Sequence, residues 1–158
     1  MDIKKYPLDL VGPIVFILVF IATFVYSRFE PHVEDVDMNY VMQFKDKPGY
    51  ILVDVRDEDV YFGKAPFPDV PGGHIPGAIS FPATDLNVAA ASAALAKAGI
   101  TKRSTIIIYC NTGALAGRFA DALIRRFNFS PSRLKNYRGS IRDWITDPKN
   151  ILLPKNHE

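Results

Sequence analysis

The chain has 158 residues, of which 48% are hydrophobic, so it is long enough for one domain with its own core and too apolar to be disordered throughout. Its 19 basic and 17 acidic residues are mixed along the chain and give a net charge of +2, without the basic stripe that nucleic-acid-binding proteins carry. The single cysteine excludes an internal disulfide, and no cysteines and histidines have zinc-site spacing. We therefore expect no nucleic-acid partner, no metal and no cofactor.

The N-terminal segment is strongly apolar. The run LVGPIVFILVFIATFVY, residues 10–26, contains no charged residue, and its length is near the lower limit for a membrane-spanning helix, which needs ~17–25 residues. A buried core helix is disfavoured because no face of this segment is polar. We predict four parts of the chain: a cytoplasmic N-terminus at 1–9, a transmembrane anchor at 10–27, a linker at 28–35 and a domain at 36–158.

A cleaved signal peptide is the alternative to an anchor. Val25 and Ser27 offer a weak cleavage site, although the apolar run is long for a signal peptide. Lys4 and Lys5 precede the run, and the mostly acidic segment RFEPHVEDVD follows it. By the positive-inside rule, this charge distribution places the N-terminus in the cytoplasm. We therefore predict a single-pass protein of the cytoplasmic membrane, with its domain on the extracytoplasmic, or periplasmic, side.

From residue 36 onward, helix and strand patterns alternate. We predict, in chain order, a helix at 36–45 capped by Asp35 or Asp37, a strand at 50–56, a short helix after Asp57, a proline-rich loop at 65–73, a short strand within 74–82, a helix at 86–99, a strand at 104–110, a helix at 113–127, a strand at 133–137 and a short helix at 140–147. The strands YILVDVR and STIIIYC are continuous apolar runs, as in a parallel sheet buried on both faces. This pattern predicts a small α/β domain with a mainly parallel sheet flanked by helices.

Cys110 lies at the predicted carboxyl end of a central strand, and the small residues NTGALAG follow it. Ligands of open α/β sheets bind at that edge. A helix N-terminus offers unpaired N–H groups, and a tight loop of small residues lets such groups converge on an anion. The thiolate is the nucleophilic form of cysteine, so these surroundings suit a reactive thiol. A buried core cysteine is the other interpretation, and this stretch alone does not decide between them.

Four stretches resemble the rhodanese sulfurtransferase family, in the family's order. CNTGALAGR resembles its active-site loop, and ILVDVRDEDVYF resembles its first signature strand. GGHIPGAISFP is very close to its GHIPGA motif, and YRGSIRDW resembles its closing GGxxxW element. The resemblance covers residues 36–144 and is closest to small, single-domain, exported members. It implies a rhodanese-like domain behind the N-terminal segment.

The resemblance implies covalent catalysis by Cys110. Its thiolate attacks the outer sulfur of thiosulfate or a similar sulfane donor, and a thiol or cyanide later accepts the sulfur. The backbone of the loop is implied to bind the small sulfur-containing anion and the persulfide. This loop consists of Asn111, Thr112, Gly113, Ala114, Leu115 and Ala116.

Supporting roles follow from the same resemblance. Asp54 and Arg56 are expected beside the loop, as an internal ion pair rather than in direct contact with substrate. His74 is expected to order a turn, and Trp144 to cover the core. Arg118, one turn into the helix, either supports the site or faces solvent.

The chain departs from the family pattern at three places. The span between Arg56 and Gly73 is longer than usual, Ser140 replaces the second glycine of the closing motif, and the loop from Cys110 to Ala116 has no basic side chain. The last departure puts the sulfur donor in question. Two other functions stay open: a phosphatase of the same fold, although the position of its phosphate-binding arginine is Ala116, and a membrane-tethered, non-catalytic module that carries sulfur or docks a protein partner of unknown identity.

Overall fold

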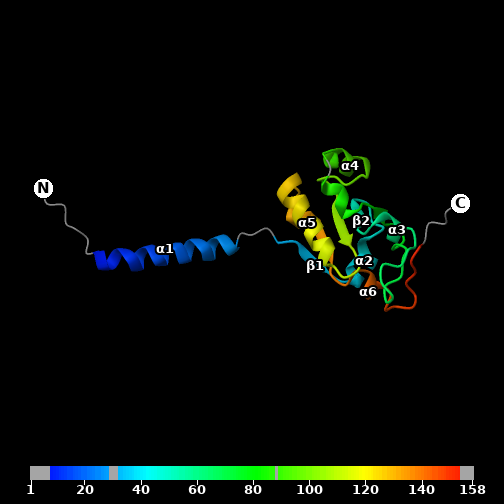
Figure 1. Ribbon diagram of the computed structural model, residues 1–158, viewed down its shortest axis with the longest axis horizontal. Helices are drawn as coiled ribbons and strands as arrows, with labels where there is room; N and C mark the ends of the chain where they lie inside the picture. Colours follow the sequence, from blue (N-terminus) through cyan, green and yellow to red (C-terminus); the bar gives the residue numbers. More distant parts are fainter. Residues whose placement is uncertain (1–7, 29–31, 88, 154–158) are drawn as a thin grey trace. The chain divides into compact units, whose positions relative to one another are not determined.

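The computed structural model describes residues 8–28, 32–87 and 89–153 (Figure 1). The chain divides into two units, Met1–His32 and Val33–Glu158. The first unit contains one helix, α1 (Leu8–Arg28), among its described residues. The second contains the sheet and the remaining described helices.

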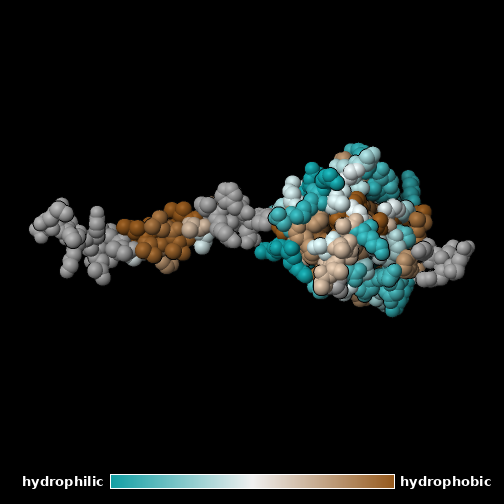
Figure 2. Space-filling model, turned by 90° about the horizontal axis from the view of Figure 1, so that it is seen from above, coloured by the Kyte–Doolittle hydropathy of each residue, from teal (hydrophilic) through white to brown (hydrophobic). Residues whose placement is uncertain are grey.

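Between Gly12 and Phe24, helix α1 exposes its apolar side chains, which form a continuous hydrophobic surface in Figure 2. Phe16, for example, is 78% exposed. Within the described residues, however, no helix is both long enough and apolar enough to cross a membrane, and the transmembrane anchor predicted at 10–27 is therefore not confirmed. Lys4 and Lys5, on which the predicted orientation depends, lie outside the described residues.

The second unit is built on a sheet of five parallel strands within the described part of the chain. The strands are β1 (Glu34–Val36), β2 (Tyr50–Asp54), β3 (Ile79–Ser80), β4 (Thr105–Tyr109) and β5 (Leu134–Tyr137). Their order is β1-β5-β4-β2-β3, so β4 and β2 lie inside the sheet. The two strands are in register from Tyr50 opposite Thr105 to Asp54 opposite Tyr109. Parallel pairing brings their carboxyl ends to one edge, and this edge carries the candidate site residues described below.

Helices cover both faces of the sheet (Figure 1). They are α2 (Met38–Phe44), α3 (Glu58–Tyr61), η1 (Ala83–Asn87), α4 (Ala91–Lys97), α5 (Ala114–Phe127), η2 (Pro131–Arg133) and α6 (Ser140–Trp144), η denoting a 3₁₀ helix. Successive side chains of a strand point to opposite faces. Ile106 and Ile108 of β4 therefore pack in one cluster with α4 and α5, while Ile107 and Tyr109 pack in another with α2 and α6. This double burial explains the continuous apolar runs in the sequence.

The predicted α/β architecture is confirmed, with differences near residue 36 and at the helix predicted at 86–99, where the structure has η1 (Ala83–Asn87) and α4 (Ala91–Lys97). Strand β1 was not predicted, because it has only three residues and two of them are exposed acidic residues. Val36 belongs to this strand, so the helix predicted from residue 36 begins instead at Met38, after Asp37. The Asp37 carboxylate accepts a hydrogen bond from the Tyr40 N–H at 2.9 Å, as expected for a helix cap.

Candidate active site around Cys110

Cys110 follows the last residue of β4 at the carboxyl edge of the sheet. It is 3% exposed, and its side chain belongs to the apolar cluster beneath α5. The three residues Asn111, Thr112 and Gly113 join it to the first turn of α5. The sequence placed the thiol correctly at the end of a central strand, and the structure adds that the thiol is almost fully buried.

Gly113 explains why the loop requires a residue without a side chain. Its φ of +82° is unfavourable for residues that carry a Cβ. A Cβ at this position would also lie 2.3 Å from the carbonyl oxygen of Arg138, far inside contact distance. With no side chain in the way, the Gly113 N–H donates a hydrogen bond to the Cys110 Sγ at 3.2 Å. The glycine thus directs a backbone donor at the sulfur.

The first turn of α5 follows this glycine and begins with further backbone donors. Ala114, Leu115 and Ala116 open the helix, where N–H groups have no acceptor within the helix. The helix dipole places partial positive charge at the same end. Gly113 and Ala116 are buried, whereas Thr112 and Ala114 are exposed. The loop residues that were predicted to bind an anion therefore lie together at one end of the sheet, with Thr112 and Ala114 on its exposed side.

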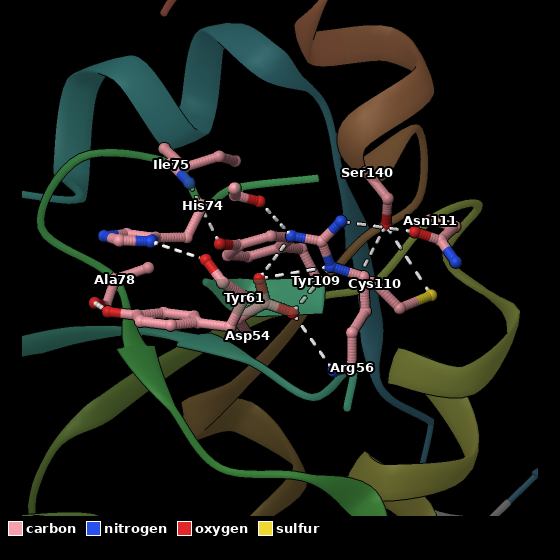
Figure 3. Close-up of polar contacts among 11 residues, drawn as sticks. Asp54, Arg56, Tyr61, His74, Ile75, Ala78, Tyr109, Cys110, Asn111 and Ser140 are labelled. Carbon is pink, nitrogen blue, oxygen red and sulfur yellow. Dashed lines mark hydrogen bonds and ion pairs between the residues drawn. The ribbon is translucent and has the colours of Figure 1, made fainter. Parts of the chain in front are cut away.

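Asp54 and Arg56 form a buried ion pair next to the loop (Figure 3). The Asp54 carboxylate is fully buried, and it accepts from Arg56 Nη2 at 2.6 Å and from Arg56 Nε at 2.9 Å. Burial lowers the pKa of Arg56, but the hydrogen bonds and charge of Asp54 outweigh it and the net pKa is raised. Arg56 Nη1 also donates to the Asn111 side-chain oxygen at 3.3 Å. The pair therefore connects the end of β2 to the Cys110 loop.

Ser140 is a residue at the site whose role the sequence did not reveal. It is fully buried and has a φ of +54°, which is unusual for a residue other than glycine. Its Oγ accepts the backbone N–H of Cys110 at 3.1 Å and donates to the Tyr137 carbonyl at 2.8 Å. The same Oγ lies 4.0 Å from the Cys110 Sγ. The only sequence signal was its position, where the family pattern has glycine.

His74 has a structural position, as expected. Its Nδ1 lies 3.0 Å from the Tyr61 carbonyl oxygen, so this nitrogen carries the proton, and its ring stacks on the Tyr61 ring at 3.8 Å between centroids. Its backbone exchanges hydrogen bonds with Leu153.

Trp144 is 2% exposed and donates its indole N–H to the Ile151 carbonyl, which is consistent with a covering role in the core.

Two clefts flank the Cys110 loop. One, of about 360 Å³, extends from the Asn111 side chain to the proline-rich segment and is lined in part by Arg56 and Leu115. The other, of about 320 Å³, lies over the start of α5 and contains the exposed Arg118. In the described part of the chain, the Arg118 side chain makes no hydrogen bond or ion pair. The structure therefore joins Asp54 and Arg56 to the loop by hydrogen bonds, whereas Arg118 lines the cleft over the start of α5.

No three histidine, cysteine, aspartate or glutamate side chains of the described residues group closely enough to hold a metal ion. The site itself presents three kinds of chemical group. These are a buried thiol, backbone N–H donors at a helix start and one arginine held by a carboxylate.

Comparisons with known proteins agree with this geometry. A family model described as "Rhodanese-like domain" matches residues 37–147, well over half of the chain. No curated protein matches the chain. Among solved structures, the anaerobic ergothioneine biosynthesis enzyme from Chlorobium limicola, in complex with its natural substrate trimethyl histidine, is similar with a TM-score of 0.70 and 21% identity, covering 79% of this chain and 28% of that one.

Two further similar structures are of EanB. A doubly substituted variant with hercynine has a TM-score of 0.69 and 19% identity, covering 77% of this chain and 27% of that one. A second variant, with ergothioneine covalently linked to a persulfide cysteine, has a TM-score of 0.68 and 21% identity, covering 77% of this chain and 28% of that one. At these identities the likeness shows a shared fold, and the chain spans less than a third of those proteins.

Proposed function

We propose that this chain, which belongs to the rhodanese-like domain family, transfers sulfur through a persulfide on Cys110. The observation that carries the proposal is the hydrogen bond from the Gly113 N–H to the Cys110 Sγ, at the start of α5 and the carboxyl edge of the sheet. A sulfur atom at this point faces backbone donors and the positive end of a helix dipole, which stabilise negative charge. EanB, whose structure includes a persulfide cysteine, is consistent with this chemistry on the same fold.

The reaction has two half-reactions. The Cys110 thiolate attacks the outer sulfur of a sulfane donor such as thiosulfate, forming a bond between the two sulfur atoms as the donor's own sulfur–sulfur bond breaks and sulfite leaves. In the second half, an acceptor thiolate or cyanide attacks the outer sulfur of the persulfide. The Cys110 thiolate is the leaving group, so the protein returns to its starting state without net oxidation or reduction.

The loop holds the terminal sulfur of the persulfide in position while the acceptor attacks that sulfur atom. Its donors are the Gly113 N–H and the unpaired N–H groups at the start of α5, already oriented by the helix. Such preorganised donors lower the barrier because they need not rearrange when charge develops. The near-complete burial of Cys110 limits the access of water to the persulfide.

The identity of the donor depends on the positive charge near the sulfur. The loop from Asn111 to Ala116 carries no basic side chain, and Arg56 is bonded to Asp54, the Gly73 carbonyl and the Asn111 side chain. A doubly charged donor such as thiosulfate thus meets backbone dipoles and the already paired Arg56 on one side of the loop, while Arg118 and Arg138 line the cleft on the other side. We propose sulfane donors as the class, with thiosulfate as one member to be tested among others.

A phosphatase activity is disfavoured at this site. The residue at the sixth position after Cys110 is Ala116, which is fully buried, so no guanidinium is available there for a phosphate.

A sulfur carrier differs from a catalyst in the rate of the second half-reaction. The burial of Cys110 favours a long-lived persulfide, and this observation keeps sulfur carriage as a second candidate.

The experiment is a sulfur-transfer assay on the full chain. Wild type is supplied with thiosulfate, inorganic polysulfide or glutathione persulfide, with cyanide as acceptor, and thiocyanate is measured. We expect turnover with at least one donor and none in the Cys110→Ser variant. Met42→Ala, at an exposed position on α2 away from the loop, is the control and should keep its activity. Full activity in Cys110→Ser would refute the persulfide mechanism, while a stable persulfide in wild type without turnover would favour the carrier.

A further inference from the structure

The proline-rich segment 64–72 forms one side of the 360 Å³ cleft whose other side is the Cys110 loop. Asn111 and Leu115 line the cleft from the loop, and Pro66 and Phe67 line it from the segment. This segment is the part of the chain that lengthens the span between Arg56 and Gly73. A longer connection that shares a cleft with Asn111 and Leu115 changes the shape of the space next to the Cys110 loop.

The segment is held in place at both its ends and its middle. A Cβ on Gly72 would lie 2.2 Å from the Gly63 carbonyl carbon, so the two backbones pack without space for a side chain. The Val70 side chain is 1% exposed, and its N–H donates to the Phe67 carbonyl at 3.2 Å. Asp69 forms a 2.7 Å ion pair with Arg142 of α6. The cleft therefore has a fixed wall opposite the loop.

Phe67 is exposed on this fixed wall. Phe67 is 53% exposed, which is high for an aromatic residue. Val70, in the same segment, is by contrast buried in the core. An aromatic ring held at the edge of a cleft offers apolar contact area at a low entropic cost, because the ring has few rotatable bonds. Leu115 faces the same cleft from α5. The wall and the loop thus present apolar surface to whatever enters between them.

The charges of the cleft do not favour a strongly anionic ligand. Its two cations are already paired: Lys64 with Asp59 at 2.6 Å, and Arg56 with Asp54 at 2.6 Å. The exposed Asp57 carboxylate adds negative charge to the same lining. The volume also exceeds the need of an inorganic ion, since water occupies roughly 30 Å³ per molecule in the liquid and ligand pockets span ~300–1,000 Å³.

We propose that this cleft binds an organic thiol that has an apolar group and no carboxylate, as the acceptor of sulfur from Cys110. The inference rests on the proposed function, because it supplies that function's second substrate. The thiolate of the acceptor attacks the outer sulfur of the Cys110 persulfide, a new organic persulfide forms, and the Cys110 thiolate leaves. The apolar group lies between Phe67 and Leu115 while this occurs.

The test compares acceptors on the full chain after it has been loaded with sulfur from inorganic polysulfide. Benzyl mercaptan, 2-mercaptoethanol and cyanide discharge wild type, Phe67→Ala and Met42→Ala, and loss of the added sulfur is followed by intact-mass measurement. Met42 is the matched control, because it is also 53% exposed but lies on α2. We expect wild type and Met42→Ala to prefer benzyl mercaptan, and Phe67→Ala to lose about five- to tenfold in the second-order rate constant of discharge by that thiol alone.

A second comparison tests the charge of the cleft. We expect 3-mercaptopropionate to discharge wild type more slowly than 2-mercaptoethanol, and Asp57→Asn to reduce this difference. Equal losses for benzyl mercaptan and cyanide in Phe67→Ala, or no preference of wild type among the thiols, would overturn the inference and leave the proposed function intact. If wild type takes up no sulfur from any donor, the proposed function fails, and this inference fails with it.

Discussion

Gly113→Ala tests how tightly the loop around Cys110 is built. Two costs arise at this position. The φ of +82° disfavours a residue with a Cβ by ~1–2 kcal/mol, and the new Cβ would meet the Arg138 carbonyl oxygen at 2.3 Å, an overpacking that typically costs ~1–3 kcal/mol. The sum is a loss of about 2–5 kcal/mol in the free energy of unfolding.

Gly99→Ala separates the two costs. Gly99 has a similar φ of +78°, but nothing lies within 4 Å of a Cβ built on it. Only the backbone cost of ~1–2 kcal/mol applies there. Urea and thermal unfolding of the two variants should therefore differ by about 1–3 kcal/mol, which for a domain of this size lowers the melting temperature of Gly113→Ala by roughly a further 2–12 °C.

Sulfur transfer should separate the two variants as well. Gly113→Ala moves the N–H that bonds the Cys110 Sγ, so its activity should fall under conditions where the chain is still folded. Gly99→Ala, at the end of α4, should keep wild-type activity. If the two variants lose the same stability, the loop has room to shift away from Arg138, and the reasoning from close packing is refuted.

Two other predictions concern buried polar groups near the loop. Arg56→Met leaves the Asp54 carboxylate buried without its partner and should lower the unfolding free energy by ~3–5 kcal/mol. The double variant with Asp54→Asn should recover part of this loss. A double variant no more stable than Arg56→Met would contradict the prediction. Ser140→Ala removes the acceptor of the Cys110 N–H and should cost ~1–3 kcal/mol in urea unfolding. Ser140→Gly should cost less because glycine tolerates the φ of +54°, and equal losses would count against strain at this residue.

Much of the fold was predictable because the sheet is buried on both faces. The strands around Ile107 and Leu52 stand out as apolar runs, and the stripe of α5 containing Phe119 has helical spacing. Four motifs in order led to the family, which the family model confirms. Strand β1 escaped prediction because it is an edge strand, and its pairing with β5 depends on backbone contacts that leave no hydrophobic pattern.

The geometry of the candidate site was predictable where a single residue type is needed for a local reason. A cysteine at a strand end followed by small residues indicates a loop that needs its backbone free, and Gly113 shows the physical reason. Contacts between distant segments were not predictable. Ser140 contacts the Cys110 N–H from a position 30 residues later in the chain. Segment 64–72 lines the cleft beside the loop, and the order of its residues does not predict this placement.

The most direct test of the account is to locate the transferred sulfur. The full chain is incubated with a sulfane donor, its intact mass is measured, and the modified peptide is sequenced by mass spectrometry before and after treatment with a reductant. We predict that the protein gains the mass of one sulfur atom, that the added sulfur is on Cys110, and that the reductant removes it. An unchanged mass with thiosulfate, inorganic polysulfide and glutathione persulfide alike would contradict the proposal that Cys110 carries sulfur.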